Sequence, residues 1–156
     1  MRRKDREITD QGKIKEIITA CHCCRLGLCE EGKAYIVPMN FGFTEKDGRY
    51  EFYFHSAKEG RKIDLILKTG YAGFEMDTNY QLKEAETACE HTASFQSVIG
   101  SGNIKIIEDL DEKKMGLLEI MKQSTKKADW EFPEPMVNAV TVFKLSVEEY
   151  ACKEHL

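Results

Sequence analysis

Apolar and polar side chains alternate along residues 25–55, which is the period of β-strands and not of helices. From Tyr35 to Phe43, every second residue is aromatic or aliphatic, so these side chains share one face. The opposite face is small and polar around Pro38, which is unusual for the interior of a strand. Glycine-containing turn sequences at 30–33 and 46–48 bound the run. The pattern therefore predicts successive antiparallel strands.

The rest of the chain combines helical and strand patterns. A first helix is predicted from an N-cap at Thr9 or Asp10 to Cys21. Gly100 and Gly102 interrupt a long strand pattern and suit a bulge. Short connections between neighbouring strands predict six mainly antiparallel strands in a closed or nearly closed sheet, of the mainly β (α+β) class. Further helices are predicted over 57–68 and 111–123, further strands over 50–55, 71–77, 92–107 and 137–145, and an irregular connector over 130–135.

The composition is that of one ordinary domain. The 156 residues are 42% hydrophobic and 32% charged with a formal net charge of −4, so we expect a single domain over 1–156 and no nucleic-acid partner. No apolar run is long enough to cross a bilayer, and the charged first residues lack the apolar segment of a signal peptide. We therefore expect a cytoplasmic protein that does not bind membranes.

Four of the six cysteines crowd into residues 21–29. Cys21-His-Cys-Cys24 with Cys29 offers thiolate and imidazole ligands of the kind that bind zinc. No second pair with clean spacing follows, and Cys89 and His91 could complete a site only if the fold brought them close. We therefore expect free thiols and no metal site, with a redox disulfide as an open alternative.

The segment from Phe54 to Lys62 carries three basic residues at a predicted strand-to-helix junction. Lys58, Arg61 and Lys62 would lie in the first helical turns, where each cation opposes the helix dipole by about 0.3–1 kcal/mol. A bound anion would reverse the sign of that cost, and free amides beside a guanidinium form a phosphate site. The alternative is a solvated basic turn.

The same segment contains a capping signal and a histidine. Ser56 and Glu59 have the spacing of a capping box, which predicts a helix that starts near Ala57. His55 ends the preceding strand, and a histidine at that place is either a hydrogen-bonded wall residue or a participant in chemistry. The spacing alone does not decide between these two roles.

Five segments, in their order, resemble the nitroimidazole-resistance (Nim-type) proteins, a branch of the pyridoxamine 5′-phosphate oxidase-like, FMN-binding split-barrel superfamily. The resemblance covers nearly the whole chain and implies an antiparallel six-stranded split β-barrel with flanking helices. The segments are residues 1–10, Cys24-Arg-Leu-Gly-Leu28, Tyr35 to Phe43, Tyr53 to Asp64 and Ser97-Val-Ile-Gly100.

The resemblance implies that FMN lies in a cleft between the two subunits of a homodimer. Arg61 and Lys62 match the basic pair that binds the flavin phosphate. His55 matches a histidine near the reactive centre, which makes it the candidate catalytic residue, as a proton donor or an anion-stabilising group. The other matching positions are His55, Ser56 and Ala57 at the approach to the phosphate, Val37, Pro38, Met39 and Asn40 beside the flavin ring, and Ser97 and Val98 on a second contacting strand.

The implied function is FMN-dependent reduction of a nitroimidazole or another small acceptor, with electrons carried by the flavin. A flavin- or haem-binding module without fast turnover is an alternative, since the superfamily includes haem-handling members. A pyridoxamine 5′-phosphate oxidase is a weaker one, because the substrate-phosphate arginines expected near the C-terminus are not found in this short chain. No glycine-rich fingerprint identifies the electron donor, because Gly100-Ser-Gly102 is too short and lies in a strand.

Overall fold

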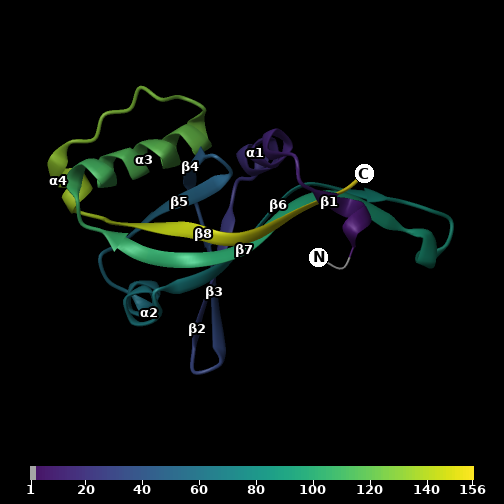
Figure 1. Ribbon diagram of the computed structural model, residues 1–156, viewed down its shortest axis with the longest axis horizontal. Helices are drawn as coiled ribbons and strands as arrows, with labels where there is room; N and C mark the ends of the chain where they lie inside the picture. Colours follow the sequence, from purple (N-terminus) through teal and green to yellow (C-terminus); the bar gives the residue numbers. More distant parts are fainter. Residues whose placement is uncertain (1–2) are drawn as a thin grey trace.

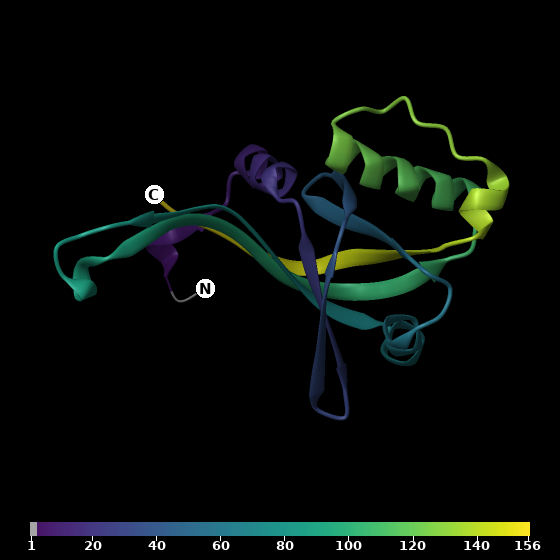
Figure 2. The same cartoon turned by 180° about the vertical axis from the view of Figure 1, so that it is seen from behind.

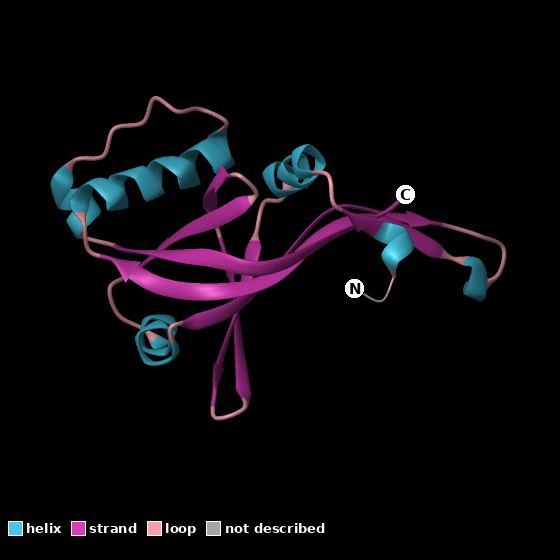
Figure 3. Ribbon diagram, viewed as in Figure 1, coloured by secondary structure: helices cyan, strands magenta, loops and turns pink. Residues whose placement is uncertain are grey.

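The computed structural model describes residues 3–156, so Met1 and Arg2 of the first resembling segment lie outside the described residues. It contains one antiparallel sheet with flanking helices (Figures 1 and 3). The strands are β1 (Glu7–Ile8), β2 (Cys24–Glu30), β3 (Lys33–Met39), β4 (Gly42–Lys46), β5 (Arg49–Ser56), β6 (Tyr71–Lys83), β7 (Thr92–Ile107) and β8 (Thr141–His155). The helices are α1 (Gln11–Ala20), α2 (Arg61–Thr69), α3 (Leu110–Thr125) and α4 (Glu134–Asn138), with short 3-10 turns η1 (Lys4–Arg6) and η2 (Ala88–Glu90).

The sheet follows the order β3-β2-β6-β7-β8-β5-β4, and β1 pairs with the far end of β8. The predicted class, a mainly β (α+β) split barrel with flanking helices, is confirmed. The sheet has eight strands and not six, and it does not close, because β3 and β4 form its two edges. The extra strands arise where the chain turns at Asn40 and Phe41, which divides the predicted Tyr35–Phe43 strand, and where Glu7 and Ile8 pair with β8.

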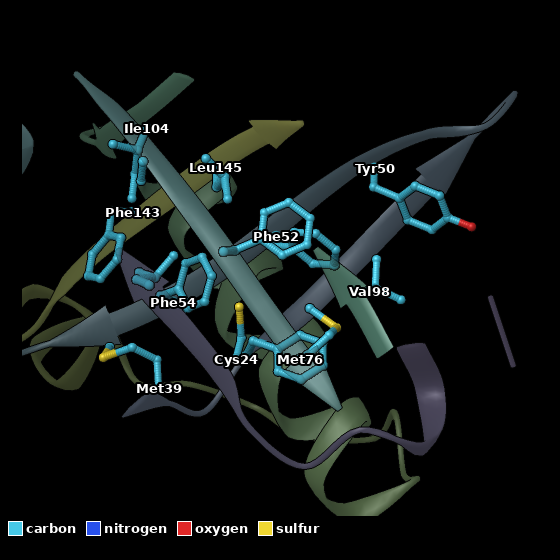
Figure 4. Packing of buried hydrophobic residues seen from close by; sticks show 14 of the residues in the cluster. Cys24, Met39, Tyr50, Phe52, Phe54, Met76, Val98, Ile104, Phe143 and Leu145 are labelled. Carbon is cyan, nitrogen blue, oxygen red and sulfur yellow. The ribbon is translucent and has the colours of Figure 1, made fainter. Parts of the chain in front are cut away.

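The two faces of the sheet are covered differently. One face buries the main core together with apolar residues of α1 and α2; Figure 4 shows its central side chains, among them Phe52, Phe54 and Met76. On the opposite face, Leu117 and Ile120 of α3 pack against β5 and β8. The rest of that second face, over β3, β2, β6 and β7, is exposed. We call it the open face, and it carries Arg25, Ile36, Tyr71, Glu75 and Ile99.

Several local predictions are confirmed by backbone geometry. The carboxylate of Asp10 caps α1 by accepting from the Lys13 amide at 2.7 Å. Gly32 and Gly48 adopt the positive φ angles that the two hairpin turns require. The predicted bulge also occurs, because the register between β7 and β8 shifts between Ser101 and Gly102. None of the helices in residues 3–156 has the length and hydrophobicity needed to cross a bilayer.

Two predicted strands are too short or misplaced. β6 continues beyond Asp77 to Lys83 and pairs with β7 as a long arm that projects from the body, with η2 at its tip (Figures 1 and 2). The predicted strand ended at Asp77 because residues 78–91 are mostly polar, whereas the β7 half of the arm lies within the predicted 92–107 strand. The last strand was placed at 137–145, but residues 134–138 form α4, and β8 runs from Thr141 to His155.

The Tyr50 hydroxyl has no hydrogen-bond partner in the described chain although the side chain is 2% exposed. Burial also raises the pKa of this phenol. Because a buried unpaired hydroxyl loses its bonds to water, we expect Tyr50→Phe to raise the free energy of unfolding by about 1 kcal/mol in urea titrations. The matched control is Tyr53→Phe, which removes a 2.9 Å hydrogen bond to Glu51 and should lower the free energy of unfolding. If Tyr50→Phe lowered the stability instead, the Tyr50 hydroxyl would have to form a hydrogen bond in the folded protein.

Candidate functional site

The N-terminus of α2 carries no side-chain cap. Gly60 is the N-cap, and the Ser56 hydroxyl donates instead to the Ala57 carbonyl at 2.8 Å, so the predicted capping box is wrong. The helix begins at Arg61 and not near Ala57, because Gly60 has a φ of 134° that side chains rarely tolerate. The first-turn amides of Arg61 and Lys62 have no intrahelical acceptor. The helix therefore presents free N–H groups at its positive end.

Arg61 and Lys62 lie against the edge strand β3 and form no ion pair within residues 3–156. The guanidinium carbon of Arg61 is 5.0 Å from the centroid of the Tyr35 ring. The Lys62 ammonium is 3.6 Å from the Met39 sulfur. Two cations without a carboxylate partner, beside free helix amides, form a site with a net attraction for a phosphate group.

The predicted ring-contact residues, Val37 to Asn40, lie at the end of β3 next to these cations. Because β3 pairs only with β2, alternate backbone groups along its outer edge are free. Pro38 and Asn40 are exposed, whereas Met39 is buried and Val37 packs against the main core. The Asn40 amide can donate and accept hydrogen bonds, and Pro38 offers no N–H of its own. The edge therefore suits a flat heterocycle with polar atoms along one side.

His55 ends β5 and faces the opposite side of the sheet from Phe54, beside Tyr53 and Val142. The residue is exposed at the surface, yet partial desolvation of the imidazole, with the charge of Lys62 as a second cause, lowers its pKa below the ordinary value. Ser56 is half-buried and pairs with Thr141, and Ala57 is exposed in the loop. The structure thus brings Arg61, Lys62 and β3 together, and His55 is connected to this group by the charge of Lys62, although its side chain faces the other side of the sheet.

Ser97 and Val98 lie apart from this group within one chain. They are on β7, three strand spacings from β3, or roughly 14 Å across the sheet. Val98 is 1% exposed and points into the main core (Figure 4), and Ser97 is 7% exposed on the other face.

The lowered pKa of His55 predicts a specific pH response. In NMR titrations, the imidazole should titrate below the value of an unstructured histidine, and Lys62→Met should raise its pKa because one of the two causes is removed. Because the folded pKa is lower than the unfolded one, protonation of His55 costs stability as the pH falls below about 6.5. Lys58→Met serves as the control and should leave the pKa unchanged. An unshifted pKa in Lys62→Met would refute the proximity of the two groups.

The cysteine cluster is divided by the fold. Cys21 and Cys24 are buried, and desolvation raises the pKa of the Cys21 thiol to about 12, whereas Cys23 is half-buried and Cys29 exposed. All six cysteines are free thiols. Among residues 3–156, no three His, Cys, Asp or Glu side chains gather in a group that could hold a metal ion.

Sequence reasoning missed Tyr35 as a neighbour of Arg61. Tyr35 was placed on the apolar face of its strand, and it does pack partly against the main core. Its contact with Arg61 joins positions that are far apart in the chain, so neither alternation nor spacing could indicate it. The only available signal was the predicted closeness of the ring-contact strand and the phosphate pair.

Comparisons with known proteins place this geometry in a family. A protein-family model described as pyridoxamine 5′-phosphate oxidase matches residues 10–154. A crystal structure from Bacteroides thetaiotaomicron, provisionally described as a 5-nitroimidazole antibiotic resistance protein, is 31% identical with a TM-score of 0.80, over 95% of this chain and 86% of that one. No curated protein matches the chain.

More distant structures share the fold. A flavocytochrome from Azotobacter vinelandii is 21% identical with a TM-score of 0.79, over 100% of this chain and 72% of that one. An FAD- and haem-binding protein from Mycobacterium smegmatis is 15% identical with a TM-score of 0.80, over 96% and 73% of the two chains. The family model and the Bacteroides structure both cover nearly the whole sequence, and the chain belongs to the pyridoxamine 5′-phosphate oxidase-like family of flavin-binding split barrels.

Proposed function

We propose that this chain is an FMN-dependent oxidoreductase that reduces nitroimidazole-like or other small acceptors. The observation that carries the proposal is the pair Arg61 and Lys62, which stand without carboxylate partners at the uncapped start of α2 and face the edge strand β3. A flavin mononucleotide matches this arrangement at both ends. Its phosphate suits the cations and free amides, and its ring suits the polar edge of β3.

Different residues of the site would bind the phosphate and the ring of the flavin. Arg61 would bind two phosphate oxygens through its planar fork, while Lys62 adds a point charge and the α2 amides donate hydrogen bonds. Val37 to Asn40 would orient the ring through their backbone and the Asn40 amide. Bound flavin would supply the electron-transfer chemistry that no side chain of this site can supply.

We propose that His55 acts on the bound acceptor. Its lowered pKa favours the neutral imidazole at pH 7. One ring nitrogen can then donate an N–H hydrogen bond to an acceptor oxygen, and the other nitrogen can take up a proton from water and release it. Reduction of a nitro group consumes protons, and a residue that exchanges protons near neutral pH meets that need.

We further propose a homodimer that uses the open face. Ile36 and Ile99 are 67% and 52% exposed on this face, and their burial against a second copy would favour association. A second copy packed there would also bring Ser97 of one chain towards the site of the other. Light scattering should give twice the chain mass, and Ile99→Glu should lower it. A monomer in both samples would refute the dimer.

The experiment that tests the function starts from purified protein. Mass spectrometry of the released ligand should identify FMN, and the protein with a chemical reductant should reduce a 5-nitroimidazole anaerobically. His55→Ala should keep FMN and lose most of this activity. Failure to bind FMN would refute the proposal, bound FMN without reduction would favour a storage or sensing module, and a Soret band would favour a haem protein.

A further inference from the structure

Arg61 is exposed, and its guanidinium lies over the Tyr35 ring, with the guanidinium carbon 5.0 Å from the ring centroid. An aromatic ring occupies the face of a guanidinium, whereas a carboxylate occupies the N–H groups in its plane. The contact with Tyr35 therefore restrains Arg61, and within residues 3–156 no carboxylate forms an ion pair with its N–H donors.

A carboxylate that could compete for these donors is already occupied. Glu30 ends β2 two residues after Leu28, which pairs with Tyr35, so its carboxylate lies in the same part of the β2–β3 hairpin as the Tyr35–Arg61 contact. The hydrogen bond with Lys68 is the main cause that lowers the pKa of Glu30, and the charge of Arg61 contributes to it. The Lys68 ammonium donates to the Glu30 carboxylate at 2.5 Å from the last turn of α2. Lys68 therefore keeps the neighbouring negative charge away from Arg61.

We propose that Tyr35 and the Glu30–Lys68 pair are positioning groups that keep Arg61 ready to bind a phosphate monoester. This inference rests on the proposed function, because the phosphate in question is that of FMN. Tyr35 restrains the Arg61 side chain, and Lys68 prevents Glu30 from forming an ion pair with Arg61. The three residues act through Arg61 and need not touch the ligand.

The size of the effect follows from side-chain entropy. An arginine that is free in solution must lose its rotamer freedom when it binds, and immobilising such a side chain weakens binding by about two- to tenfold. If Tyr35 already restrains Arg61 in the free protein, this loss does not occur on binding. The effect should be present for ligands with a phosphate and absent for ligands without one.

FMN and riboflavin, which lacks the phosphate, provide the matched pair of ligands for the test. Tyr35→Leu should weaken FMN binding by about two- to tenfold and leave riboflavin binding unchanged, and Tyr35→Phe should bind FMN like the wild type. In an Arg61→Ala background, Tyr35→Leu should have no further effect on FMN. An equal loss of FMN and riboflavin affinity in Tyr35→Leu would mean a general packing role and would overturn the inference.

A second set of variants tests the Glu30–Lys68 pair without touching a buried residue. Lys68→Met frees Glu30 to pair with Arg61 and should weaken FMN binding by about two- to fivefold. Glu30→Gln in the same chain should restore it, and Glu30→Gln alone should have little effect. An unchanged affinity in Lys68→Met would remove this pair from the proposal.

These outcomes separate the inference from the proposed function. If the wild type binds neither FMN nor riboflavin, the proposed function fails and the inference fails with it. If Arg61→Ala loses FMN affinity while Tyr35→Leu and Lys68→Met do not, the phosphate site stands and only the positioning role is wrong.

Discussion

Replacing Arg61 with alanine should weaken FMN binding by about 1.5–3 kcal/mol, which corresponds to about 10- to 150-fold in the dissociation constant. The structure gives Arg61 no carboxylate partner within residues 3–156, so alanine breaks no ion pair and the free protein should keep its stability. The loss should therefore appear in ligand affinity alone. Fluorescence quenching of FMN by the apoprotein measures it directly.

Two further variants sharpen this prediction. Arg61→Lys keeps the charge and loses the planar guanidinium, so its affinity for FMN should lie between those of Arg61→Ala and the wild type. Arg49→Ala removes the same residue type from the exposed β4–β5 hairpin and should leave the affinity unchanged. If Arg61→Ala bound FMN as tightly as the wild type, the phosphate would have to lie elsewhere, and the start of α2 would be the solvated basic turn that the sequence also allowed.

The elements that the sequence predicted well are those with strong local signals. The Asp10 cap, the glycine turns and the alternation from Tyr35 onward each depend on a few neighbouring residues, and all three recur in the structure. The start of α2 shows the limit of such signals. Ser56 and Glu59 have the right spacing for a capping box, but the conformation of Gly60 between them and Arg61 stops the helix from beginning earlier.

The site itself could be predicted only in separate pieces. The basic pair at 61 and 62 and the polar strand around Pro38 were each visible in the sequence, but their contact depends on how α2 folds back on β3. The β6 half of the arm was missed because Tyr80 and Leu82 are its only large apolar residues beyond Asp77 and both are exposed among polar neighbours, so the strand pattern is weak.

Gly42→Ala should lower the free energy of unfolding by about 3 kcal/mol. A Cβ at Gly42 would lie 2.2 Å from the backbone carbonyl carbon of Glu119 and from the amide nitrogen of Ile120. Both atoms belong to the backbone of α3, so no side-chain rotation relieves the clash. The helix would have to move away from β4.

That movement would also open the smaller core cluster, in which Leu117 and Ile120 of α3 pack against Tyr53 and Val142. Gly27→Ala is the matched control, because its Cβ would meet only the Gly73 carbonyl oxygen at an ordinary 3.8 Å, and its stability should change little. Urea unfolding of the two variants compares them directly. Because Arg61 lies on α2, the folded fraction of Gly42→Ala should still bind FMN. If the two variants were equally stable, α3 could not pack directly on Gly42.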